Sequence, residues 1–225
     1  MTKYAAPCFG IASCPERFVD AGVGEYGGVS AAAHSDGVTG VLLVGGGSRR
    51  FGSPKALARI GEKTFSDIAW ERLAWCDEQL AYGKLVDGLA LSFPVQDDDS
   101  CVRAPLAGVV AGLRAARFDV IVALPVDLPL VKDEALQTLA SACGGDAAVP
   151  QTGPLPGAYR RSALPVLERR LRTRELALAA ALEELETRVV EVDPRLLANI
   201  NCPQDLPWLE PGLFSPSRDI LFDDG

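Results

Sequence analysis

The segment from Leu42 to Leu57 combines glycine with positive charge in a way that suits a phosphate group. Its sequence, LLVGGGSRRFGSPKAL, holds a glycine triplet and three cations: Gly45, Gly46, Gly47, Arg49, Arg50 and Lys55. Glycines accept positive φ and place no Cβ between backbone N–H groups and an anion, so a short glycine loop can wrap a phosphate. Lys55 adds a compact charge for the remaining oxygens. The apolar residues before the glycines predict a strand that presents this loop.

Two commoner phosphate loops do not fit these residues. A P-loop needs Lys followed by Ser or Thr directly after its last glycine, whereas Ser53 and Pro54 separate Gly52 from the lysine and Ala56 follows it. A dinucleotide fingerprint needs a third glycine at position 50, where the chain has arginine. An ordinary glycine-rich turn is the remaining alternative, and the three nearby cations favour a phosphate site over it.

Asp127 is the strongest candidate for a metal ligand. It follows the apolar run Val120–Leu124 and stands between two prolines, Pro125 and Pro129. Ligands of open α/β sheets bind at the carboxyl ends of strands, and a carboxylate there can hold Mg²⁺ against triphosphate oxygens. The alternative is a turn or helix N-cap, because a helix is predicted to start near Lys132.

Three consecutive acids, Asp97, Asp98 and Asp99, precede the predicted helix at 105–117. A carboxylate can accept two N–H donors from the edge of guanine and leave adenine unpaired, which would make the contact selective. A run of acids is also typical of a solvated loop, and both interpretations stay open.

These features resemble the molybdenum cofactor guanylyltransferase family of nucleotidyltransferases, whose first loop reads Leu-x-Gly-Gly-x-x-x-Arg-Met/Phe-Gly-x-x-Lys. The residues that fill this pattern are Leu43, Gly45, Gly46, Arg50, Phe51, Gly52 and Lys55. Four more segments follow in the family order: RAPLAGVVAGL (103–113), ALPVDLPLV (123–131), GPLPGAYRR (153–161) and NINCPQDL (199–206). They resemble the helix start, the metal strand, the acceptor-side loop and the Asn-x-Asn segment of the family.

The resemblance implies an α/β fold with a three-layer, Rossmann-like and mostly parallel sheet of the nucleotide-diphospho-sugar transferase type. It implies transfer of GMP from GTP to molybdopterin that carries molybdenum, with Mg²⁺ as cofactor. The nucleotide-binding residues would be Leu43, Val44, Gly45, Gly46, Lys55, Asp97 and Asp127. Arg50, Lys55 and Asp127 would be catalytic, with Asp127 as the metal ligand. Asn201 would orient metal or acceptor phosphate, unless it only forms the turn before Pro203.

Three positions depart from the family pattern. Ala104 replaces a glycine before Pro-Leu-Ala-Gly, and Val126 replaces a cysteine before Asp127. Ser92 or Phe93 stands near the place where the family has an asparagine for ribose or base contact.

Two other functions compete with the guanylyl reading. Cytidylyl or sugar-phosphate nucleotidyltransferases use a similar loop but more often show Ala-Gly where this chain has Gly45-Gly46, so the glycine pair favours guanine. A nucleotide-binding module without turnover would not require Arg50, Lys55 and Asp127 together. Contacts with other proteins of cofactor biosynthesis are a further expectation, and the oligomeric state is left open.

Composition limits the partners and the location. The chain has 225 residues, 48% hydrophobic and 23% charged, which suits one globular catalytic domain. A net charge of −8 argues against nucleic acid and acidic membranes as partners. No apolar run approaches the ~20 residues that span a bilayer, and no long apolar signal segment is evident, so a cytoplasmic enzyme with reduced thiols is expected.

Apolar runs of strand length alternate with helical patterns from residue 38 onward, which predicts a parallel sheet covered on both faces. Strands are predicted at 39–44, 88–93, 119–124, 146–150 and 188–192, and helices at 64–80, 105–117, 132–142, 161–171 and 173–186. The core face of the first helix would carry Phe65, Ile68, Ala69, Leu73, Cys76 and Leu80. Residues 1–37 have neither period and are expected to be a loosely ordered extension, 38–210 the nucleotidyltransferase domain and 211–225 a tail.

Overall fold

A computed structural model describes residues 37–45, 55–84 and 90–200 of the chain. Nearly all of the proposed extension, the proposed tail and three proposed site residues, Gly46, Arg50 and Asn201, lie outside the described residues. The proposed domain boundaries therefore stay predictions.

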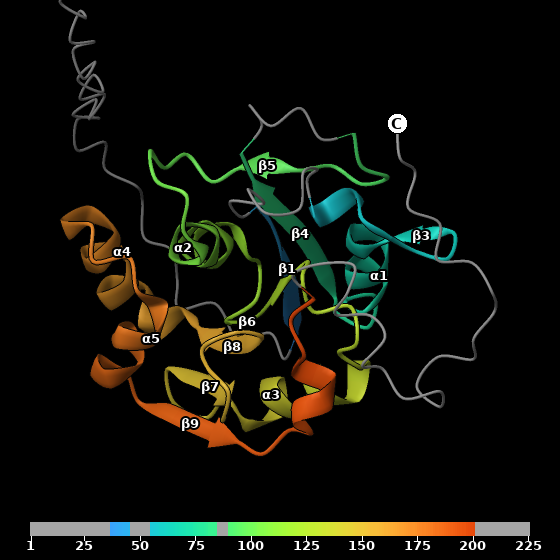
Figure 1. Cartoon of the computed structure of the whole chain (residues 1–225). Helices are drawn as coiled ribbons and strands as arrows, with labels where there is room; N and C mark the ends of the chain where they lie inside the picture. The colour runs from blue at the N-terminus through green and yellow to red at the C-terminus, as the bar shows by residue number, and fades with distance from the viewer. Residues whose placement is uncertain (1–36, 46–54, 85–89, 201–225) are drawn as a thin grey trace, which may run out of the picture. The chain divides into compact units, whose positions relative to one another are not determined.

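Within the described part of the chain, seven strands form one sheet in the order β5-β4-β1-β6-β8-β7-β9 (Figure 1). Their bounds are Val38–Val44 (β1), Glu78–Gly83 (β4), Gln96–Asp97 (β5), Val120–Pro125 (β6), Ala147–Pro150 (β7), Gly157–Arg160 (β8) and Thr187–Val190 (β9). All neighbouring strands pair in parallel except at β8, which runs antiparallel to both β6 and β7. The predicted mostly parallel sheet is confirmed. Arg59–Ile60 (β2) and Lys63–Thr64 (β3) form a separate small hairpin.

Helices cover both faces of the sheet, which gives the predicted three layers. Their bounds are Phe65–Glu71 (α1), Pro105–Ala115 (α2), Asp133–Ala142 (α3), Leu164–Thr173 (α4) and Leu178–Ala181 (α5). Leu42 and Val44 of β1 belong to the core shared with α1 and α3, whereas Val41 and Leu43 belong to the core shared with α2, α4 and α5. Successive side chains of a strand point to opposite faces, so an uninterrupted apolar run such as β1 is buried on both.

Two glycines bring α2 close to the central strand. A Cβ on Gly108 would lie 2.6 Å from Cδ2 of Leu43, and one on Gly112 would lie 2.8 Å from Cγ2 of Val41. Residues four apart share one helix face, so both glycines turn toward β1. Gly108, the glycine of the Pro-Leu-Ala-Gly segment, therefore has a packing role, because it lets the first turns of α2 lie close against β1.

The predicted helix 64–80 is wrong. Of the predicted strand 88–93, residues 90–93 form no strand, and residues 88 and 89 lie outside the described residues. The helix ends at Glu71, and residues 78–83 form β4, whose positions Ala81 and Tyr82 are buried. Phe65, Ile68 and Ala69 lie in α1 and are buried, as predicted. Leu73 is buried just after the helix, whereas Cys76 and Leu80 lie farther along the chain and are only partly buried. Pairing of β4 with both β1 and β5 satisfies its backbone groups, and this long-range pairing overrides the local pattern.

Later elements also differ from their predictions. The segment 157–160, interpreted as a loop, is strand β8. The first predicted helix of the C-terminal pair begins with a 3-10 turn at Arg161–Ala163 and ends at Thr173, capped by Arg174, which adopts a left-handed φ of 61°. The second is reduced to α5 and a 3-10 turn at Leu182–Glu184.

Candidate active site

The proposed site residues gather where the parallel strands end. Strand β1 pairs with β4 on one side and with β6 on the other. The strand order therefore reverses at β1: β4 and β5 continue the sheet on one side, and β6 and the later strands continue it on the other. Such a switch point opens a crevice at the carboxyl ends of the strands. Gly45 follows β1, Asp127 follows β6, and Asp97 is the last residue of β5.

Lys55 and Asp127 form an ion pair at this edge of the sheet. The Nζ of Lys55 lies 3.7 Å from Oδ2 of Asp127, and the two side chains are 18% and 26% exposed. The fold thus brings together two residues that are far apart in sequence and were assigned separately to phosphate and metal. Both remain open enough to meet a ligand, because neither is sealed in the core.

A short 3-10 turn, Lys55–Leu57 (η1), carries the lysine. The buried hydroxyl of Ser66 donates to the carbonyl of Ala56 at 2.8 Å, and Phe65 N–H donates to the carbonyl of Ala58 at 2.7 Å. Both donors lie at the start of α1, whose first turn is stabilised by a capping box between Thr64 and Asp67. The backbone that places Lys55 is therefore anchored independently of its side chain.

Asp127 is not a helix N-cap. The N-cap of α3 is Lys132, whereas Asp127 lies in the turn directly after β6. Val126, at the position of the family's cysteine, is buried in the core below it. Volume and apolarity at position 126 are thus used for packing, and the aspartate alone projects from this turn into the partly exposed region.

The segment before Asn201 reaches the same place. Ile200 N–H donates to the backbone carbonyl of Asp127 at 3.0 Å, and the Ile200 side chain is buried against Phe65. Asn201 itself is not described, but its neighbour lies directly beside the metal candidate. The predicted role of Asn201 in orienting metal or acceptor phosphate stays a prediction.

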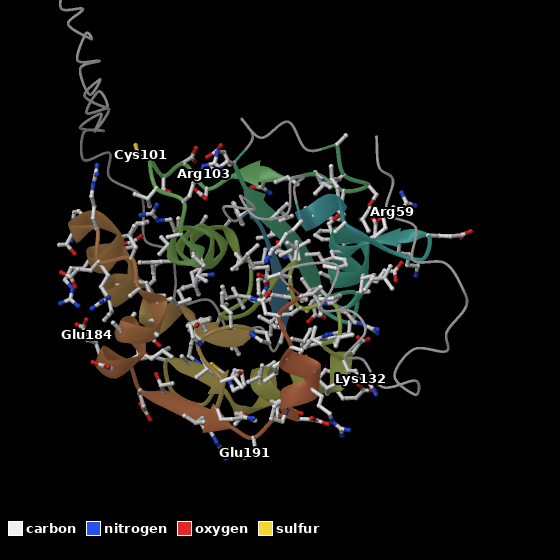
Figure 2. All side chains as sticks on the ribbon, in the orientation of Figure 1. Arg59, Cys101, Arg103, Lys132, Glu184 and Glu191 are labelled. Carbon is white, nitrogen blue, oxygen red and sulfur yellow. The ribbon has the colours of Figure 1, made fainter. Side chains whose placement is uncertain are left out.

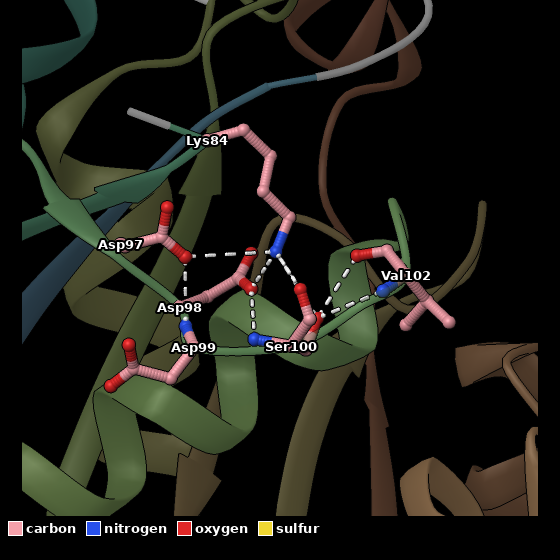
Figure 3. Close-up of polar contacts among 6 residues, drawn as sticks. All are labelled: Lys84, Asp97, Asp98, Asp99, Ser100 and Val102. Carbon is pink, nitrogen blue, oxygen red and sulfur yellow. Dashed lines mark hydrogen bonds and ion pairs between the residues drawn. The ribbon is translucent and has the colours of Figure 1, made fainter. Parts of the chain in front are cut away.

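Asp97 belongs to a loop wrapped around a lysine that the sequence interpretation missed. Lys84 follows β4 directly, and its ammonium contacts Oδ1 of Asp98 and the carbonyl of Ser100 and lies 3.8 Å from Oδ1 of Asp97 (Figure 3). Because residues 64–80 were predicted to form a helix, Lys84 was expected in the connection after that helix and not at the end of a strand. A correct strand at 78–83 would have been the signal, because the residue after a parallel strand lies at the ligand edge.

Ser92 and Phe93, near the position of the family's asparagine, hold their loop against α1. The Ser92 hydroxyl donates to Oδ1 of Asp67 at 2.6 Å, and this bond is the main cause of the lowered pKa of Asp67. The Phe93 ring stacks on Trp70 with centroids 4.3 Å apart. Their role is structural, and the side chain at the end of the second parallel strand is instead Lys84.

Leu43 and Val44, two proposed nucleotide-binding residues, have buried side chains on opposite faces of β1. Any contact with a nucleotide would come from their backbone, as would that of Gly45, which is exposed.

On the loop between β5 and α2, Cys101 and Arg103 are exposed (Figure 2).

The segment resembling the acceptor-side loop holds the fold at its far end. The Arg161 guanidinium donates to the carbonyls of Leu113, Ala116 and Phe118, where α2 ends and β6 approaches. The Tyr159 hydroxyl donates to the carbonyl of Pro154 at 2.6 Å, and burial raises its pKa. These two side chains satisfy backbone groups rather than facing the strand ends.

Comparison with known proteins agrees with this geometry. The model of the MobA-like NTP transferase domain matches residues 40–189. The chain belongs to the MobA-like NTP transferase family. It is 31% identical over 193 residues to a probable molybdenum cofactor guanylyltransferase of Bacillus licheniformis, covering 76% of this chain and 95% of that protein. A molybdenum cofactor guanylyltransferase of Desulfosudis oleivorans is 30% identical over 78% of this chain and 95% of its own length.

Solved structures of nucleotidyltransferases share the fold. The crystal structure of molybdopterin-guanine dinucleotide biosynthesis protein A from Archaeoglobus fulgidus matches with a TM-score of 0.65 and 26% identity, over 75% of this chain and 95% of that one. A cytidylyltransferase for 2-C-methyl-D-erythritol 4-phosphate from Thermus thermophilus shares the fold, with a TM-score of 0.56 and 19% identity. The predicted nucleotide-diphospho-sugar transferase fold is confirmed, and the protein is a nucleotidyltransferase. Among its described residues, no helix is long and apolar enough to cross a membrane.

Proposed function

We propose that this nucleotidyltransferase transfers GMP from GTP to molybdopterin that already carries molybdenum, and releases pyrophosphate. The observation that carries the proposal is the Lys55–Asp127 pair, 3.7 Å apart at the carboxyl ends of β1 and β6. A triphosphate needs positive charge and a metal ligand within reach of one another, and this pair offers both. The names of relatives at about 30% identity support the guanylyl and molybdopterin parts.

The donors at this edge fit Mg²⁺. Asp127 presents a hard carboxylate oxygen that is partly exposed, and Mg²⁺ in nucleotide sites commonly takes one or two carboxylates and completes its shell with water and substrate phosphates. Asp127 would hold the ion, with Asn201 as a second candidate. When bound, Mg²⁺ supplies charge that offsets the phosphate oxygens.

The protein's own groups would act mainly by binding and orientation. The backbone N–H groups of the glycine loop and the ammonium of Lys55 would hold the triphosphate, with Arg50 as a further cation. An oxygen of the pterin's terminal phosphate then attacks the α-phosphorus in line, forming a new P–O bond while the bond to the bridging oxygen of pyrophosphate breaks. This nucleophile is already an anion, so no general base is required, and positioning carries the catalysis.

Base selection is proposed to rest on Asp97. Guanine presents two adjacent N–H donors, N1–H and the 2-amino group, which match one carboxylate. Cytosine presents a single amino donor beside two acceptors, so an acidic acceptor at this place favours guanine over cytosine. The cytidylyltransferase fold is the same, and therefore the base-reading residue rather than the fold distinguishes the two reactions.

A nucleotide panel tests the proposal. With Mg²⁺ and molybdenum-loaded molybdopterin, pyrophosphate release is expected with GTP and far less with CTP, ATP or UTP, and none of it without the acceptor. Asp97→Asn should narrow the difference between GTP and CTP. Preference for CTP, or acceptor-independent release, would contradict the proposal.

A further inference from the structure

The backbone before Lys84 is packed tightly against the end of β1 and Gly45. Gly83, the residue before it, pairs with Asp97 of β5 and packs so closely on β1 that a Cβ there would lie 2.1 Å from the carbonyl oxygen of Val44. The Cα of Gly83 also lies 4.0 Å from the Cβ that a side chain at Gly45 would have. Lys84 therefore starts between the glycine loop and the acidic loop, with little backbone freedom.

The acidic loop is wound around the Lys84 ammonium. Lys84 is 12% exposed and Asp98 only 9%, and the ammonium also lies 3.3 Å from Oγ of Ser100. Around this cation the loop closes on itself, because Ser100 N–H donates to Oδ1 of Asp98 at 3.0 Å and Asp99 N–H donates to Oδ1 of Asp97 at 2.9 Å. Figure 3 shows Asp97, Asp98 and Ser100 converging on the Lys84 ammonium.

This loop conformation depends on the cation. Asp99 adopts a left-handed φ of 53°, which costs free energy for a residue other than glycine. Three consecutive carboxylates repel one another, and a nearly buried Asp98 without a partner would be strongly unfavourable. The Lys84 ammonium offsets the repulsion and pairs with Asp98, and it links the orientation of Asp97 to the end of β4.

We propose that Lys84 is a positioning residue that holds Asp97 in the orientation that recognises guanine. The proposal rests on the function given above and deepens it, since Asp97 would contact the base and Lys84 would act only through Asp97. Lys84 also lowers the negative charge of the acidic loop, which would otherwise repel the triphosphate of the same nucleotide.

Equilibrium binding of GTP and ITP with Mg²⁺ tests the assignment without an acceptor. ITP lacks the 2-amino group, so a wild-type protein that reads guanine through Asp97 should bind GTP about 10- to 100-fold more tightly, the value of one hydrogen bond to a charged group. In Lys84→Met, which keeps the length of the side chain and removes its charge, this GTP/ITP ratio should fall toward one. A merely structural defect would weaken both nucleotides equally and leave the ratio unchanged.

Controls separate the possible failures. Lys63→Met removes a lysine that pairs with Glu71 at 2.7 Å but is 56% exposed, and it should keep the wild-type ratio. In an Asp97→Asn background, Lys84→Met should cause no further loss of discrimination, because it acts through Asp97. If Lys84→Met does not fold, the double variant Lys84→Met/Asp98→Asn removes the buried charge together with its partner and gives the same readout.

Three outcomes are decisive. The assignment is supported if the GTP/ITP affinity ratio falls toward one in the Lys84 variants and Lys84→Met causes no further fall in the Asp97→Asn background. A retained ratio in either folded Lys84 variant overturns it and leaves the proposed function intact. A wild-type protein that binds GTP and ITP equally would overturn guanine reading by Asp97 itself, and the positioning role with it.

Discussion

Replacing Lys55 with alanine separates the binding role of this lysine from any role in the fold. Its ammonium lies 3.7 Å from Asp127, but the η1 turn that carries it is held by backbone groups and by the buried Ser66 hydroxyl. The truncation removes a cation from the ligand edge and leaves these anchors in place. We therefore expect nucleotide binding to weaken while the folded structure persists.

The two effects should differ in size. A hydrogen bond between a charged donor and phosphate contributes about 1.5–3 kcal/mol, and each 1.4 kcal/mol is a factor of ten, so GTP affinity should fall about 10- to 100-fold. A partly exposed ion pair contributes about 0–1 kcal/mol to stability, so the free energy of unfolding should change by less than about 1 kcal/mol. This difference makes the variant diagnostic.

Titration calorimetry with GTP and Mg²⁺ measures the first quantity and urea unfolding the second. Lys55→Arg retains the charge and should recover part of the affinity, whereas Lys63→Ala removes an exposed lysine and should change neither value. Normal GTP binding together with normal pyrophosphate release in Lys55→Ala would remove this lysine from the active site. A loss of several kcal/mol of stability would instead assign it to the fold.

Three further changes test other parts of the structure. Asp127→Asn should keep the melting temperature and abolish magnesium-dependent turnover, because the amide keeps the shape but not the charge; turnover that stays normal across a magnesium titration would refute the metal role. Gly112→Ala should lower the free energy of unfolding by about 1–3 kcal/mol, since its Cβ would lie 2.8 Å from a stiff core valine, whereas Gly144→Ala, with open space, should not. Cys76 should resist alkylation at pH 8 until urea is added, because burial raises its pKa from 9.0 to about 12. The stability linked to its protonated thiol is complete below pH 9 and is lost as pH rises toward 12. Rapid labelling of the native protein would contradict this prediction.

The sequence alone determined the features in which neighbouring residues carry the whole signal. The uncharged run Val38–Val44 predicts a strand buried on both faces of a sheet, and β1 confirms this prediction. The same reasoning placed Asp127 at the end of β6. The order of the motifs then indicated the family, and with it the parallel α/β fold.

Only the tertiary structure decided which distant residues meet. Residues 64–83 show an apolar spacing that a helix could use throughout, and the division into α1 and β4 depends on hydrogen bonds from β4 to β1 and β5. That division places Lys84 at the ligand edge, where it organises Asp97 and Asp98. The 3.7 Å approach of Lys55 to Asp127 is likewise a tertiary contact, between the η1 turn and the turn after β6. Local sequence indicated β1, β6 and the residues that follow them, but the pairing of non-adjacent strands, on which the site depends, is a property of the folded sheet.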